Sequence, residues 1–206
     1  MRYNSDVTKR PQSNLELIRR VLGSEYLDLS VTRMNLEEDF ETGLSHVVVD
    51  SIDPQGTAQT VEGRGVGLVD ALWSGLLERY SMEYQSLKSI ELVGFSVHAN
   101  LETKSAANQG SDAVAEVKLD IRNSEGKQFV FVDASRSIAA SCTRAVVASM
   151  EYFINAERAF ITLHHSLKDA RERHREDLVT RYTKELAEVV KSTSYAEVIE
   201  SLKKEI

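Results

Sequence analysis

Hydrophobic and polar residues alternate along the first part of the chain in short β-rich stretches, and helical spacing follows them. The first three stretches are residues 26–34, 45–53 and 56–64, and the alternation is clearest in the first. A period near 3.6 then places apolar side chains on one helical face at Val69, Leu72, Trp73, Leu76, Leu77 and Tyr80. This pattern predicts three antiparallel strands followed by one helix.

The same order of elements occurs a second time. Residues 89–101, 112–122 and 127–134 have strand-like patterns, with a long mobile loop expected at residues 102–111. A helix is expected to begin near Ser135. It is rich in small residues that allow close approach of backbones, within the chain or across a dimer axis: Ala139, Ala140, Ser141, Cys142, Ala145, Ala148 and Ser149. The fold class is therefore α+β, with two β-rich modules of about three strands and one helix packed together.

The end of the chain has the pattern of a long helix, continuous or broken once. From about Glu157 onward there is no glycine or proline, and one apolar stripe contains Phe160, Leu163, Leu167, Ala170, Leu178, Tyr182, Leu186 and Val189. We expect this stripe to dock on the same chain, because its spacing departs from the strict heptads of a coiled coil with a partner. The predicted organisation is an N-terminal extension with a short helix (1–24), an α+β domain (25–160, with modules 25–84 and 85–160) and a helical tail (161–206).

Composition narrows the classes of function. The 206 residues carry a net charge of −7, which argues against a broad nucleic-acid interface. No apolar run approaches the length of a membrane span, and the N-terminus lacks the apolar stretch of a signal peptide. Cys142 is the single cysteine, which excludes an internal disulfide framework. We therefore expect a reduced, cytoplasmic protein that binds neither nucleic acid nor a membrane.

Three glycines at alternate positions precede the first predicted helix. The spacing of Gly63, Gly65 and Gly67 does not match a dinucleotide-binding loop, and no Gly-Lys-Ser/Thr sequence of a P-loop is present. A helix that begins here could offer free backbone amides to an anion such as a carboxylate. The other interpretation is that the glycines only let the chain turn from the strand into the helix. Residue chemistry alone favours this second interpretation.

Catalytic and metal-binding patterns are weak. His46 and His98 lie in strand-like stretches, where a structural hydrogen bond is the usual role of a histidine. The tail histidines, His164, His165 and His174, are expected to be exposed and form no convincing set of metal ligands. Cys142 is surrounded by small residues, as in a buried apolar position. We predict no catalytic residue, no metal site and no cofactor.

Four segments together resemble the C-terminal regulatory domain of 2-isopropylmalate synthase, and citramalate synthases have a similar domain. They are "GRGVGLVDAL", "LKSIELVGFSVHANL", "GSDAVAEVKLDIRN" and "SIAASCTRAVVASMEYFINA", and the resemblance covers about residues 25–160. It implies two β-rich modules, pairing with a second copy, and feedback control of leucine biosynthesis through bound leucine or isoleucine. Catalysis in that family belongs to a separate metal-dependent barrel, so the resemblance implies a regulatory module without enzyme activity of its own.

The resemblance also implies an amino-acid pocket between the glycine corner and the next two strands. Carried over to this sequence, its residues are Gly65, Val66, Gly67, Leu68, Val69, Leu92, Phe95, Ala99, Ala113 and Ala115. The chain departs from the family at the corner, where Val66 and Leu68 replace a polar residue and a proline. Phe95 stands where the family often has tyrosine, and in the second module Asp133 and Ser137 replace a glycine and an aspartate.

Two hypotheses of different classes follow from these features. In the first, the chain is a homodimeric sensor that binds a branched-chain amino acid and regulates a synthase subunit or another enzyme. In the second, it is a homodimeric scaffold whose tail or dimer surface binds a protein and whose pocket binds no small molecule. The corner glycines and the alanine-lined strands favour the sensor, whereas the loss of the polar corner residue favours the scaffold.

Overall fold

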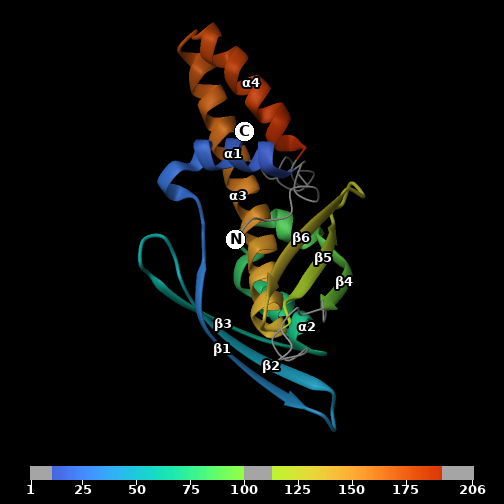
Figure 1. Ribbon diagram of the computed structural model, residues 1–206. Coiled ribbons are helices and arrows are strands. Elements are labelled where there is room, and N and C mark those ends of the chain that lie inside the picture. The colour runs from blue at the N-terminus through green and yellow to red at the C-terminus, as the bar shows by residue number, and fades with distance from the viewer. Residues whose placement is uncertain (1–10, 100–112, 192–206) are drawn as a thin grey trace.

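The computed structural model describes residues 11–99 and 113–191. The loop expected at residues 102–111 and the last part of the tail, residues 192–206, lie outside the described residues. The chain forms two three-stranded antiparallel sheets, two helices that pack on them, and a helical part away from the sheets (Figure 1). The predicted α+β class with two β-rich modules is confirmed.

The first module extends from the N-terminal helix to the end of the helix that packs on its sheet. Its elements are α1 (Pro11–Leu22), the short helix η1 (Gly23–Glu25), β1 (Ser30–Asp39), β2 (Leu44–Ile52), β3 (Ala58–Gly65) and α2 (Leu68–Tyr80). The sheet order is β1-β2-β3, so β1 is an edge strand. Alternate residues of the central strand β2 are buried, as expected for a strand with one face on the core. Helix α2 packs on β3 and β2.

The second module repeats this arrangement. Its elements are η2 (Gln85–Ser89), β4 (Glu91–Ala99), β5 (Ala115–Arg122), β6 (Gln128–Ser135) and α3 (Ile138–Glu172). The sheet order is β4-β5-β6, and α3 packs on β6 and β5. Four residues of β5 that point toward the core are almost completely buried: Ala115, Val117, Leu119 and Ile121. A single apolar core joins the two modules, because α2 and α3 also pack against each other.

The two modules correspond residue by residue at several points. Each has a register shift near the start of its first strand, between Val31 and Arg33 in β1 and between Leu92 and Gly94 in β4. Each helix begins three residues after the end of the preceding strand, with N-cap residues Gly67 and Ser137. The predicted internal repeat of architecture therefore extends to strand irregularities and helix starts.

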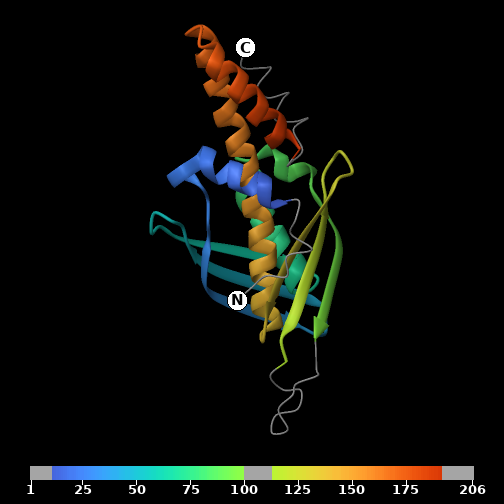
Figure 2. The same cartoon turned by 45° about the horizontal axis from the view of Figure 1, so that its top comes forward.

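Helix α3 and α4 (Glu176–Val190) form the helical part, and α1 packs on both. Figures 1 and 2 show α4 lying beside the distal half of α3, away from the two sheets. Several residues of the predicted stripe are buried here: Phe160, Leu163, Leu167, Ala170 and Val189. Phe160, Leu163 and Val189 belong to a second apolar cluster together with Ile18 and Leu22 of α1. The stripe thus docks within the chain, as expected, and up to residue 191 the helix is broken once, between α3 and α4.

The first strand is shorter at its start than the alternation predicts. Residues 26–29 are not part of β1, because side chains of α3 take their backbone groups. The Leu27 N–H donates to Asn155 Oδ1 at 2.8 Å, and Asn155 Nδ2 donates to the Leu27 carbonyl oxygen at 2.7 Å. The Leu29 N–H donates to the Glu151 carboxylate. These contacts join residues more than 100 positions apart, which local alternation cannot reveal.

Candidate functional site

The glycine corner lies at the end of β3, where the chain enters α2. Gly67 is the N-cap of α2 with φ of 85°, a conformation that favours glycine, and no side chain caps the helix there. The Val66 N–H donates to Asp70 Oδ2 at 2.8 Å, so the Asp70 carboxylate is held close to the corner. A Cβ added to Gly67 would meet open space. The corner therefore combines free space, an uncapped helix start and one carboxylate.

The other two glycines have a structural role. Gly63 and Gly65 face α2, and a Cβ on Gly65 would lie 2.7 Å from the Ala71 backbone nitrogen. A Cβ on Gly63 would collide with the Ala71 carbonyl group. The alternate spacing of these glycines is thus explained by the close packing of β3 on α2, and only Gly67 needs the left-handed backbone conformation.

The strand residues of the predicted pocket lie on one face of the second sheet. Leu92 pairs with Ile121, Phe95 with Leu119 and Ala99 with Ala115, so their side chains share the face whose β5 residues are buried. Phe95 is nevertheless 47% exposed, because β4 is the edge strand and α3 packs on the other two strands. Ala113 precedes β5 and is half-buried.

The ten predicted residues therefore form two groups in the single chain. The corner group, Gly65 to Val69, ends with the first turn of α2, and its most exposed member is Val66 at 75%. The strand group comprises Leu92, Phe95, Ala99, Ala113 and Ala115. Ala99 lines a shallow hollow of about 500 Å³ together with His98, Val114, Glu116 and Ala134. The larger cavity described below is lined by neither group.

The remaining side chains singled out in the sequence have mostly structural surroundings. His46 Nε2 lies 2.8 Å from Glu62 Oε1, and the Cys142 thiol is buried, which raises its pKa. His164 corrects an expectation, because it is half-buried and stacks on Phe160 instead of being exposed. Its Nδ1 is buried without a hydrogen-bond partner.

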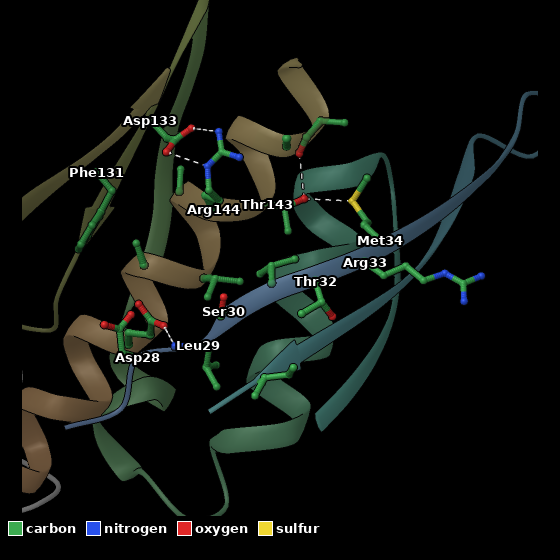
Figure 3. Close-up of a pocket in the computed structure, with 18 of the residues that line it drawn as sticks. Asp28, Leu29, Ser30, Thr32, Arg33, Met34, Phe131, Asp133, Thr143 and Arg144 are labelled. Atoms are coloured by element: carbon green, nitrogen blue, oxygen red, sulfur yellow. Dashed lines mark hydrogen bonds and ion pairs between the residues drawn. The ribbon is translucent and has the colours of Figure 1, made fainter. Parts of the chain in front are cut away.

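A cavity of about 870 Å³ lies between α3 and the two edge strands β1 and β6 (Figure 3). We call it the β1–α3 cleft. It is lined by Asp28, Leu29, Ser30, Val31, Thr32, Arg33, Met34, Ile52, Asp53, Pro54, Phe131, Val132, Asp133, Ser137, Ala139, Ala140, Thr143, Arg144, Ala145, Val147, Ala148 and Glu151. The small residues of α3 were the only sequence signal for it. Ala139, Ala140 and Ala148 face the cleft, whereas Ser141, Cys142 and Ser149 are buried.

Charged groups lie at two ends of the β1–α3 cleft (Figure 3). At one end, Arg144 forms a two-point ion pair with Asp133, with N–O distances of 3.0 Å and 2.6 Å. At the other end lie the carboxyl groups of Asp28 and Glu151. The pKa of Glu151 is raised to about 8, mainly by burial, while the Leu29 N–H acts to lower it and the neighbouring Asp28 acts to raise it.

Within residues 11–99 and 113–191, no group of three or more His, Cys, Asp or Glu side chains could hold a metal ion. Among the helices of the same residues, none has the length and the apolar character that crossing a membrane requires.

The fold defines a two-module α+β domain in which each module ends in a strand-to-helix corner and both share one core. This is the architecture that the sequence resemblance implies for an allosteric domain. The family model described as the LeuA allosteric (dimerisation) domain matches residues 12–154, and the chain belongs to this family. The match extends from α1 to the middle of α3. No curated protein sequence matches the chain significantly.

Proposed function

We propose that the chain is a homodimeric sensor that binds leucine or a similar branched-chain amino acid and regulates a synthase or another enzyme in trans. The observation that carries this proposal is the open corner at Gly67, in a chain that belongs to an allosteric domain family. No catalytic group is needed for this role, because binding energy alone can change the conformation of a partner enzyme.

The corner has the chemistry to recognise an amino-acid headgroup. The first-turn amides of α2 have no side-chain cap at Gly67, so they can donate to a carboxylate. The Asp70 carboxylate, held by the Val66 N–H, can accept from an ammonium group. A branched aliphatic side chain then needs apolar neighbours, and Leu68, Val69 and Phe95 are such residues.

Pairing with a second copy would complete the site. Val66, Phe95 and Ile138 are large apolar side chains that are 75%, 47% and 49% exposed in the single chain. Large exposed apolar side chains favour association, and the family is a dimerisation domain. A second copy that covers these residues would enclose an effector that a single chain leaves open to water.

The second candidate is a homodimeric scaffold that binds no small molecule. It is supported by Val66, which replaces the family's polar residue at the corner and points no hydrogen-bonding group at an effector. The helical tail gives this candidate less support, because its apolar stripe packs against α1 and within the α3–α4 hairpin.

The test is calorimetric titration of the full chain with leucine, isoleucine and valine, together with sedimentation at several protein concentrations. An effector present at 100 times its dissociation constant should stabilise the folded state by about 2.7 kcal/mol. Gly67→Val should abolish binding, because the added side chain occupies the corner and strains a backbone with positive φ. A stable dimer that binds none of the three amino acids would overturn the sensor and leave the scaffold.

A further inference from the structure

The β1–α3 cleft is the counterpart, in the internal repeat, of the predicted amino-acid site. The predicted site joins the corner at Gly67 to strand β4. The cleft joins the corner at Ser137, the equivalent N-cap, to strand β1. Val31 and Met34 line it, and the matching register shifts place them where Leu92 and Phe95 stand in β4.

The two corners differ in the size of the side chains on their helices. Six residues after the N-cap, α2 has the buried Trp73, whereas α3 has Thr143. Ala140 and Ala148 of α3 correspond to Asp70 and Glu78 of α2. Smaller side chains leave space between a helix and its neighbours, and the cleft of about 870 Å³ is within the range of small-molecule sites.

No cation of the described residues forms an ion pair with the carboxyl groups at the acidic end of the cleft. The Glu151 carboxylate accepts the Leu29 N–H, and it forms no ion pair with any residue in the described part of the chain. Arg19 lowers its pKa and is the smallest of the influences on it, and Asp28 adds a second negative charge. Burial makes the ionised form of this carboxyl costly, and a positively charged group placed beside it would offset that cost.

We propose that the β1–α3 cleft binds a small molecule that carries a primary ammonium group on an aliphatic body. The ammonium group lies between Glu151 and Asp28, and the aliphatic body lies against Val147, Ala148 and Phe131. The Arg144–Asp133 ion pair closes the opposite end. This inference is independent of the effector site at Gly67, because the two sites share no residue.

Binding should release a proton near neutral pH. Burial raises the pKa of Glu151 to about 8, so this carboxyl group is largely protonated at pH 7. An adjacent ammonium group favours the ionised form and lowers that pKa, so the proton leaves when the ligand binds. The calorimetric enthalpy should therefore depend on the ionisation enthalpy of the buffer.

The experiment is titration of the full chain with n-pentylammonium chloride, with 1-pentanol as the neutral control of the same length. Pentylammonium should bind saturably, and pentanol at least tenfold more weakly. Glu151→Gln, which keeps an acceptor for the Leu29 N–H, should weaken pentylammonium binding at least tenfold. Ala148→Leu, which fills the cleft from an exposed helix position, should also weaken pentylammonium binding at least tenfold. If Ala148→Leu does not fold, Ala140→Val takes its place as the variant that fills the cleft.

Glu62→Gln is the matched control, because this exposed carboxyl lies on β3, outside the cleft. The affinity of the Glu62→Gln variant for pentylammonium should equal that of the unmodified chain. Absence of saturable binding, or affinity unchanged by Glu151→Gln or by filling the cleft, overturns the proposal. Gly67→Val should leave pentylammonium binding intact while abolishing that of leucine, so failure at one site is distinguishable from failure at the other.

Discussion

Gly63 of β3 and Gly75 of α2 lie against each other with no side chain between them. A Cβ on Gly75 would lie 2.9 Å from the Gly63 Cα and 2.6 Å from the Glu62 carbonyl oxygen. Backbone thus packs directly on backbone at this point, which holds α2 close to the strand that ends in the corner. The distance leaves no room for even one methyl group.

Gly75→Ala should therefore lower the free energy of unfolding by about 1–3 kcal/mol, the usual cost of overpacking a core. In an exposed helix position the same change would stabilise by up to about 1 kcal/mol, because alanine is the better helix former. Urea denaturation measures the difference. Glu78→Ala, at an exposed position of the same helix, is the control and should change stability by less than about 0.5 kcal/mol. Increased stability of Gly75→Ala would refute the close contact.

The pKa of Glu151 predicts how stability depends on pH. Its value of about 8 in the folded chain lies above the ordinary 4.5, so the folded state binds the proton more tightly than the unfolded state. The contribution of Glu151 to the free energy of unfolding is fully present below pH 4.5, and it is lost as pH rises toward 8. At 1.36 kcal/mol per pKa unit, the rise from 4.5 to about 8 corresponds to a loss on the order of 5 kcal/mol.

Glu151→Gln should remove this dependence, because the amide does not titrate. Denaturant unfolding of both proteins from pH 5 to pH 9 gives the test. The difference in unfolding free energy should change in favour of the variant as pH rises. Parallel curves for the two proteins would show that Glu151 does not titrate in this range.

The turn between α3 and α4 contains a strained residue. His174 has φ of 54°, the only positive φ of a residue other than glycine among the described residues, and its N–H donates to the Arg171 carbonyl oxygen at 3.1 Å. His174→Gly should stabilise the chain by about 0.5–1 kcal/mol, because glycine adopts this conformation without steric cost. Thermal unfolding measures the change.

His165→Gly is the matched control for this substitution. The residue is exposed inside α3, where glycine should destabilise by about 1 kcal/mol. If His174→Gly and His165→Gly both lowered the stability, the inferred strain at His174 would be contradicted.

The corner provides a prediction that separates the sensor from the scaffold. Val66→Asn restores a polar side chain at an exposed position, so it should leave stability within about 0.5 kcal/mol. If the corner binds an amino acid, one added hydrogen bond of about 1 kcal/mol should raise the affinity for leucine about fivefold. Calorimetry gives the affinity, and Met82→Asn, at another exposed apolar position, should not change it. An unchanged affinity in Val66→Asn would remove this residue from the effector site.

Much of the architecture could be predicted from the sequence because it depends on local periodicity. The strands and the two module helices of the described residues follow from the spacing of apolar residues, and the helical character after Gly126 follows from the absence of breakers. Neither pattern shows whether the tail helix is continuous or broken between Glu172 and Glu176. The start of β1 could not be predicted, since Asn155 and Glu151 bind residues 27 and 29 from a distant helix. The half-buried position of His164 likewise depends on packing in the helical part.

Sequence by itself determined the α+β class, the repeat and the resemblance to an allosteric domain, because periodicity and short motifs are properties of neighbouring residues. Only the tertiary structure decided what the glycines do, since the collision that excludes a side chain at Gly63 comes from α2 folding back onto β3. It also decided where open space remains. The β1–α3 cleft is bounded by β1, β6 and α3, which meet only when the two modules share one core, so no local pattern could reveal it.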